Sequence, residues 1–138
     1  YSSGNAASLN SSDTNYYVVN STGGVTKEAI WWVESQTMTT PATIANIQVR
    51  FTAKTNRNNT AVQFYVQDPA TGNFSTIVAS GFTFTEVDTD RTHFFYLDAA
   101  VVSYINQPGV RKVKLKVEAS ANATFTLSTN QVLSIAEP

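Results

Sequence analysis

The chain has 138 residues, of which 42% are hydrophobic, and this suits one domain with a single hydrophobic core. Only 14% of the residues are charged and the formal net charge is −1, so we expect no nucleic-acid partner. The sequence has no cysteine, which excludes disulfides and thiolate metal sites. No apolar run approaches the ~20 residues that span a bilayer, so we expect no membrane partner.

The chain ends and the composition suggest a piece of a larger protein. Residues 1–12 are rich in Ser and Asn and are expected to be a frayed terminus or a linker remnant. Residues 13–138 are expected to form one domain. No signal peptide is visible. Few charges and many Thr and Asn residues favour a secreted, extracellular protein, so we expect a mature, monomeric domain cut from a longer chain.

Short segments of period-two alternation, separated by turn residues, follow one another along the chain and predict strands. Residues 99–106 are the one candidate helical stretch, with one short turn at most, ended by Pro108 and Gly109. The predicted strands are residues 16–20, 26–34, 44–54, 62–67, 74–79, 82–86, 92–98, 110–118, 124–128 and 132–136.

The stretch VRKVKLKVE at residues 110–118 shows the alternation most clearly. Apolar side chains on one face of this strand alternate with Lys112, Lys114 and Lys116 on the other. Such a strand has one face on a core and one in water, as antiparallel sheets allow. The lysines either form a solvated face that blocks aggregation or line one side of a groove for an acidic polymer.

This pattern predicts an all-β fold, namely a two-sheet antiparallel β-sandwich with a jelly-roll-like strand order. In that order residues 110–118 lie between residues 29–34 and 62–67. Residues 74–79 lie on the outer side of residues 62–67. A competing topology pairs the third and fourth predicted strands as a hairpin, which would place Arg50 beside Tyr65. The sequence alone separates the two poorly.

A series of short motifs, spread over most of the chain, occurs in a characteristic order. They are Asp13, YYVV at 16–19, Trp32, ANIQVRF at 45–51, FYV at 64–66, TGNF at 71–74, YIN at 104–106, VKLKV at 113–117 and FTLS at 125–128. The series resembles β-sandwich carbohydrate-binding modules of secreted bacterial multidomain proteins, which sit beside catalytic domains of polysaccharide-degrading enzymes. The resemblance implies a sugar site on one sheet face or at a loop end, and often a structural calcium ion.

Outward aromatic side chains are the candidate sugar platforms, because aromatic rings stack on the apolar faces of sugar rings. By alternation Trp31 faces the core, whereas Trp32 shares the other face with Glu34. A bulge in this strand would exchange the faces on which the two tryptophans lie. The alternative to a sugar platform is that Trp32 lies in the core or packs under a loop. Tyr65, between Gln63 and Gln67, is either a second platform or an ordinary outward tyrosine.

The jelly-roll order would gather these candidates on the wet face of one sheet. A trough across three strands would span ~10–15 Å, which is room for two to four sugar rings. The lysines would favour an acidic chain. The predicted polysaccharide- or oligosaccharide-binding residues are Trp32, Glu34, Gln63, Tyr65, Gln67, Lys112, Lys114 and Lys116.

An acidic turn is the candidate metal site. Asp88 and Asp90 have a spacing that could help to hold calcium, with Asp13 as a further ligand. Calcium needs ~6–8 oxygen ligands, so a plain acidic turn is the alternative. His93 is the sole histidine and is expected to be structural. The clustered aromatic residues are expected to lie in the core; they are Phe82, Phe84, Phe94, Phe95 and Tyr96.

No residue set carries a recognisable catalytic chemistry. Glycoside hydrolysis needs two opposed carboxylates, whereas the carboxylates here are scattered singly, and nucleophile-elbow and phosphate-loop motifs are absent from the sequence. We therefore predict a non-catalytic carbohydrate-binding module that targets a secreted enzyme to a polysaccharide. The alternative is a structural or adhesive domain, such as a spacer, a surface-layer or fibre unit, or a protein-binding module.

Overall fold

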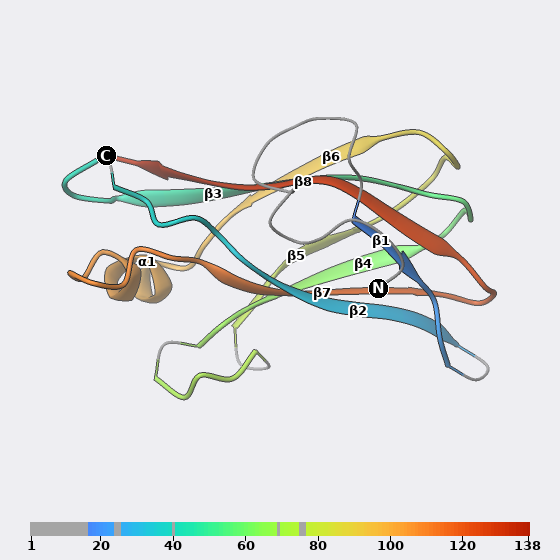
Figure 1. Cartoon of the computed structure of the whole chain (residues 1–138), viewed down its shortest axis with the longest axis horizontal. Coiled ribbons are helices and arrows are strands. Elements are labelled where there is room, and N and C mark those ends of the chain that lie inside the picture. Colours follow the sequence, from blue (N-terminus) through green and yellow to red (C-terminus); the bar gives the residue numbers. More distant parts are fainter. Residues whose placement is uncertain (1–16, 24–25, 40, 69, 75–76) are drawn as a thin grey trace.

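Two antiparallel four-stranded sheets lie face to face in the computed structural model, which describes residues 17–23, 26–39, 41–68, 70–74 and 77–138 (Figure 1). We call them the front sheet and the back sheet. The front sheet has the order β2 (Lys27–Glu34), β7 (Lys114–Ala121), β4 (Ala61–Val66), β5 (Ile77–Thr83). The back sheet has the order β1 (Tyr17–Asn20), β8 (Thr126–Glu137), β3 (Asn46–Thr55), β6 (Arg91–Tyr96).

The core fills the space between the sheets. Along β3 every second residue is buried, and Val49 and Phe51 have no exposed surface. Phe64 from the front sheet meets Phe51 from the back sheet edge-to-face, with ring centroids 4.9 Å apart. The alternation of the sequence therefore has a direct physical cause, because successive side chains of a strand point to opposite faces and one face is desolvated here.

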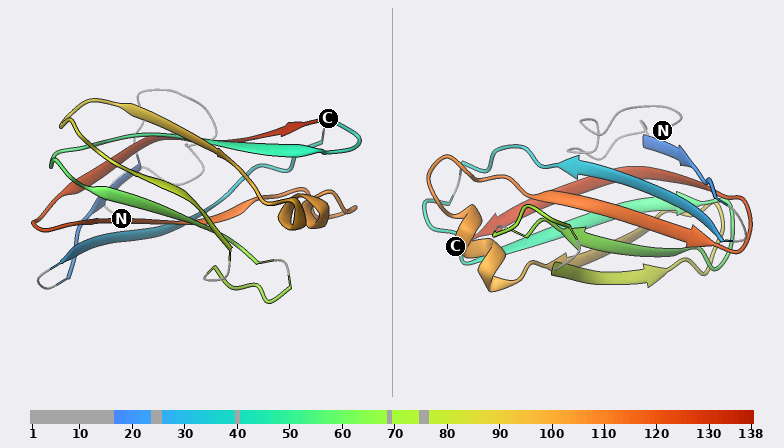
Figure 2. Two further views of the ribbon diagram at one scale, coloured as in Figure 1. Left: turned by 180° about the vertical axis from the view of Figure 1, so that it is seen from behind. Right: turned by 90° about the horizontal axis from the view of Figure 1, so that it is seen from below.

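The sandwich and the order predicted for its front sheet are confirmed. β7 lies between β2 and β4, and β5 lies outside β4 (Figure 2). The competing hairpin of β3 and β4 is wrong, because the two strands lie in different sheets. Arg50 faces Phe94 of β6 and Leu133 of β8 instead of Tyr65.

Two pairs of predicted strands are single strands in the structure. β5 continues through Gly81, where a Cβ atom would clash with the carbonyl oxygen of Val62. β8 continues past Asn130, where the register against β3 shifts by one residue. The sequence pattern predicts breaks at Gly81 and at residues 129–131, whereas a glycine and a bulge let one strand bend there without ending.

Other expectations need correction at the ends of elements. β7 begins at Lys114, because Arg111 has a φ of 53° and interrupts the strand expected from residue 110. The helix α1 (Ala99–Ile105) has seven residues and is longer than the single turn expected. The helix lies at one end of the sandwich (Figure 1), and its buried side chains are Val101, Val102 and Ile105.

Two residues expected in the core lie on the surface. Phe94 is 58% exposed and Tyr96 is 57% exposed on the outer face of β6, whereas Phe82, Phe84 and Phe95 are buried as expected. The expectation fails because residues 93–96 (HFFY) form an apolar cluster in the sequence, whereas successive side chains of a strand point to opposite faces.

Some expectations fall beyond the part of the chain that the structure describes. The linker at residues 1–12 and the proposed ligand Asp13 lie outside the described residues. Within the described residues, no helix is long and apolar enough to cross a membrane.

Candidate functional site

Six of the eight predicted sugar-binding residues stand in rows on the outer face of the front sheet, and among them Gln63 of β4 lies opposite Glu118 of β7. Trp32 lies opposite Lys116, and Lys116 lies opposite Tyr65, so one row crosses three strands. The next row holds Glu34 opposite Lys114. The β-ladder produces these rows because side chains on one face of adjacent strands stand directly beside one another.

Trp32 is the open aromatic surface of this face. Its side chain is 56% exposed, whereas Trp31 is 3% exposed and packs on Tyr17 with ring centroids 4.7 Å apart. The alternation therefore assigned the two tryptophans correctly. A large exposed ring among polar neighbours is a surface that an apolar sugar face can cover.

Tyr65 is less accessible than the sequence suggested. Its ring is half-buried, and the ammonium Nζ of Lys116 lies 4.7 Å from the ring centroid. The same Nζ lies 3.5 Å from a carboxylate oxygen of Glu118. A cation–π contact held by an ion pair covers one face of the ring, so Tyr65 shapes the floor and offers little stacking surface.

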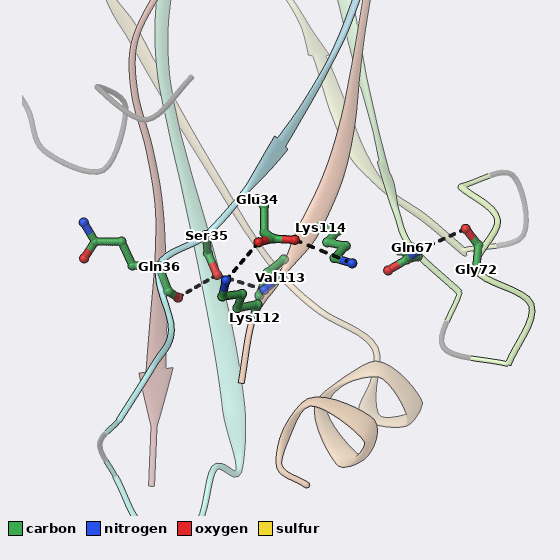
Figure 3. A network of polar contacts seen from close by, with 8 residues as sticks. All are labelled: Glu34, Ser35, Gln36, Gln67, Gly72, Lys112, Val113 and Lys114. Atoms are coloured by element: carbon green, nitrogen blue, oxygen red, sulfur yellow. Dashed lines mark hydrogen bonds and ion pairs between the residues drawn. The ribbon is translucent and has the colours of Figure 1, made fainter. Parts of the chain in front are cut away.

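Glu34 joins the other two lysines of this face. Its Oε1 lies 3.1 Å from Nζ of Lys112, and its Oε2 lies 3.5 Å from Nζ of Lys114 (Figure 3). The hydrogen bond from Lys112 lowers the pKa of Glu34 below its usual value of 4.5, against a smaller opposing effect of desolvation, and the charges of both lysines lower it further. The carboxylate is therefore ionised at neutral pH.

Gln67 fixes the turn that borders the face. Its Nε2 donates to the carbonyl oxygen of Gly72 at 3.1 Å (Figure 3). Its backbone N–H donates to the carbonyl oxygen of Lys114 at 3.0 Å. The turn also closes through Asp68, whose N–H donates to the carbonyl oxygen of Asn73 at 2.7 Å. This turn leads directly into Phe74, whose position beside the sheet depends on it.

Two adjoining hollows open on this face. The first has a volume of about 290 Å³ and lies between Trp32 and Phe74, with Glu34 and Lys114 also lining it. The second has a volume of about 460 Å³ and extends to Tyr104 of α1, which is 41% exposed. Both hollows share Glu34 and Lys114, and we call the two together the front trough.

The front trough includes residues that the sequence reasoning missed. The sequence pattern placed Phe74 in a strand and Tyr104 in a short turn. Helical spacing could have found Tyr104, because α1 buries Val101 and Ile105 and leaves this tyrosine exposed. The hollows follow β2 and β7 toward α1, whereas the sequence predicted a trough across the strands. Lys112 reaches it from the loop before β7.

The structure leaves the proposed calcium site as a prediction. Asp88 and Asp90 lie in the loop between β5 and β6, and the N–H of Asp88 donates to the carbonyl oxygen of Thr55 at 2.8 Å. Among the described residues, no group of three or more His, Cys, Asp or Glu could hold a metal ion. The two carboxylates fall short of the ~6–8 oxygens that calcium takes.

His93 belongs to the aromatic packing. The centroid of its ring lies 4.9 Å from the ring centroid of Phe82. The ring is also stacked on that of Phe64, with centroids 5.9 Å apart. A larger hollow of about 580 Å³ opens near the other end of the sandwich, beside Asp90 and Arg91. The guanidinium of Arg91 donates to the carbonyl oxygen of Thr83 at 2.6 Å, so this cation already holds the edge of β5.

Comparison with known proteins gives a likeness of fold. No protein-family model and no curated protein matches the chain. A candidate sugar-binding protein from Bacteroides thetaiotaomicron is similar over 96% of this chain and 85% of its own, with a TM-score of 0.50 and 11% identity. This likeness confirms the sandwich that the sequence resemblance implied.

Two further solved structures are similar at a TM-score of 0.49. One is TmCBM61 in complex with β-1,4-galactotriose, at 13% identity over 89% of this chain and 68% of its own. The other is the enzymatically active domain of tailspike protein 4 of bacteriophage CBA120, at 12% identity over 92% of this chain and 18% of its own.

Proposed function

We propose that this domain is a non-catalytic carbohydrate-binding module and that its front trough holds a neutral glycan chain. The observation that carries the proposal is the hollow between Trp32 and Phe74, beside the ion pair of Glu34 and Lys114. It combines an apolar surface with charged hydrogen-bonding groups in one concave place, which is the usual composition of a small-ligand site.

The chemistry of a sugar ring matches this arrangement. A pyranose presents C–H groups on its faces and hydroxyls around its rim. The exposed ring of Trp32 offers a surface for the C–H face. The carboxylate of Glu34 accepts hydrogen bonds from hydroxyls, and the ammonium of Lys114 donates to them. Hydrogen bonds to charged groups are stronger than neutral ones, so the pair adds affinity and orientation.

The ion pairs favour a neutral chain over the acidic chain expected from the three lysines. Lys112 and Lys114 share the carboxylate of Glu34, and Lys116 lies beside Glu118. An acidic polymer would have to compete with these carboxylates and would be repelled by them. Affinity at this trough should therefore depend less on salt than affinity at a face whose cations have no carboxylate partner, because screening acts on uncompensated charge.

The same proposal extends to the setting of the domain. The resemblance to modules of secreted bacterial enzymes supports a domain that holds a neighbouring catalytic domain on its polysaccharide. A monomeric module attached outside the cell fits this role, since one trough on one face is sufficient to anchor it.

A glycan array followed by calorimetry on the best neutral ligand tests the proposal. Trp32→Ala and Phe74→Ala should each weaken binding, and Trp32→Ala should weaken it at least about tenfold. Phe94→Ala is the matched control, because it removes an equally exposed ring from the other sheet. If both trough variants fold and keep the affinity of the unaltered domain, the proposed site is wrong.

A further inference from the structure

A second aromatic surface lies on the outer face of the back sheet. Phe94 and Tyr96 are two residues apart on β6, so both rings point outward, with Cα atoms ~7 Å apart. They are 58% and 57% exposed. β6 is an edge strand, so the surface is open on the side away from β3. Core packing cannot account for an exposed pair of large rings on a strand, and such a surface is typical of a binding face.

A chain of hydrogen bonds runs beside these rings. Arg50 lies opposite Phe94 on β3, and Gln48 lies opposite Tyr96. Nε of Arg50 donates to Oε1 of Gln48 at 3.0 Å, and Nε2 of Gln48 donates to the Tyr96 hydroxyl at 3.3 Å. These two hydrogen bonds fix the orientation of the Gln48 amide. They use neither the hydroxyl proton of Tyr96 nor the two terminal nitrogens of Arg50, so these donors can bind a ligand.

Arg50 also differs from the front lysines in its charge environment. The ion pairs of the front face involve Lys112, Lys114 and Lys116, whereas Arg50 takes part in no ion pair with any described residue. Arg50 is exposed and lies opposite the aromatic residue Phe94. The back face therefore offers a guanidinium outside any ion pair, whereas on the front face two carboxylates offset part of the charge of three ammonium groups.

We propose that β3 and β6 form a second glycan site, which takes a chain bearing uronate residues. Phe94 and Tyr96 cover the faces of successive sugar rings, and the planar guanidinium of Arg50 binds a ring carboxylate through paired N–H donors. Gln48 and the hydroxyl of Tyr96 complete the polar side of the site. This site goes beyond the proposed function, because it lies on the other sheet and binds a different class of ligand.

The unpaired charge favours this ligand over a second copy of the chain. A symmetric contact centred on these rings would place the same patch on both partners. It would bring two uncompensated Arg50 side chains toward each other, and a partly desolvated pair of like charges is unfavourable. A carboxylate-bearing sugar supplies the missing negative charge and covers the rings in the same step.

Binding of sodium polygalacturonate, compared with its fully methyl-esterified form, tests this site. The two polymers share a backbone, and only the first carries the carboxylates. We expect the intact domain to bind polygalacturonate and to lose this binding as salt rises. Arg50→Gln and Phe94→Ala should each reduce the affinity about tenfold or more. Both residues are exposed, so the variants should keep the folded spectrum.

Two control variants locate the binding on the back face. Arg57→Gln removes one positive charge from an exposed loop and should leave polygalacturonate binding unchanged. Trp32→Ala should also leave it unchanged, so failure of the front trough and failure of the back site are distinguishable. Equal binding of the methyl ester, tighter binding of a sulfated polymer such as heparin, or a dimer in sedimentation that Phe94→Ala dissociates would overturn the proposal.

Discussion

The outer faces of the two sheets carry similar residues but pair their charges differently. On the front face Glu34 lies between two lysines, and its carboxylate neutralises much of their field. On the back face Arg50 contacts an amide and lies opposite an exposed ring. The number of cations on a face therefore says little about its ligand. The carboxylates within reach of each cation decide whether the face attracts an anionic chain or a neutral one.

The inner faces show no such difference. Both are apolar, and both alternate with outer residues in the same period of two. A substitution inside should therefore act on folding, whereas substitutions on the two outer faces should act on separate ligands. Variants on the inner and outer faces test that division.

Leu115→Asp should unfold the domain. The side chain is 2% exposed in the core, and an isolated buried carboxylate costs several kcal/mol, which is a large part of a typical stability of ~5–15 kcal/mol. Lys114→Asp, one residue away on the outer face, should stay folded. Thermal melting followed by circular dichroism checks the pair. The reverse behaviour would show that the faces of β7 are assigned wrongly.

Trp32→Ala and Phe94→Ala should have opposite effects on two ligands. We expect the first to lose at least about tenfold in affinity for a neutral glycan and to keep its affinity for polygalacturonate, and the second to do the reverse. Calorimetry with both ligands on both variants gives a four-way comparison. A variant that weakens both ligands equally would show that the two faces are coupled or that one site serves both.

Much of the fold could be predicted from the sequence because alternation and burial have the same cause. The period of two over β3 and β7 identified the strands and their buried faces, and the same period over β2 separated Trp31 from Trp32. The errors occurred where local signals conflict with tertiary structure. Gly81 reads as a break but is required by the close approach of Val62, a contact between strands that no local pattern contains.

The candidate site was harder to predict because its shape depends on segments that are distant in sequence. Phe74 reaches the trough from a turn held by Gln67, and Tyr104 reaches it from α1. The ion pair of Lys112 with Glu34 joins residues 78 positions apart. Composition shows that charges exist, but only the fold shows which of them are paired, and the choice between acidic and neutral ligands depends on that pairing.

Calcium remains a separate prediction, because neither outer face requires it. If Asp88 and Asp90 hold an ion together with Asp13, that ion stabilises the native state by mass action. Adding a chelator should then lower the melting temperature by about 3 °C, corresponding to roughly 1 kcal/mol. Asp88→Asn with Asp90→Asn should remove the response. An unchanged melting temperature, together with no metal in elemental analysis, would reject the site.

Glu34 gives the stability of the domain a weak pH dependence. The lysines lower its pKa in the folded state below 4.5, so its contribution to stability is present above the unfolded value. That contribution is lost as the pH falls through the lowered folded pKa. The side chain is 43% exposed, so solvent screening keeps the contribution below ~1 kcal/mol.

Urea unfolding of the intact domain and of Glu34→Gln measures this contribution directly. The difference between their free energies of unfolding should be constant from pH 7 to about pH 5 and should shrink below pH 4.5, where the carboxyl group becomes protonated. Arg50→Gln on the back face should give a difference that does not change over the same range, because it leaves Glu34 and its two lysines in place. A constant difference for Glu34→Gln down to pH 2 would mean that the carboxylate and the lysines do not interact in solution, and the case for a neutral ligand in the front trough would lose its electrostatic basis.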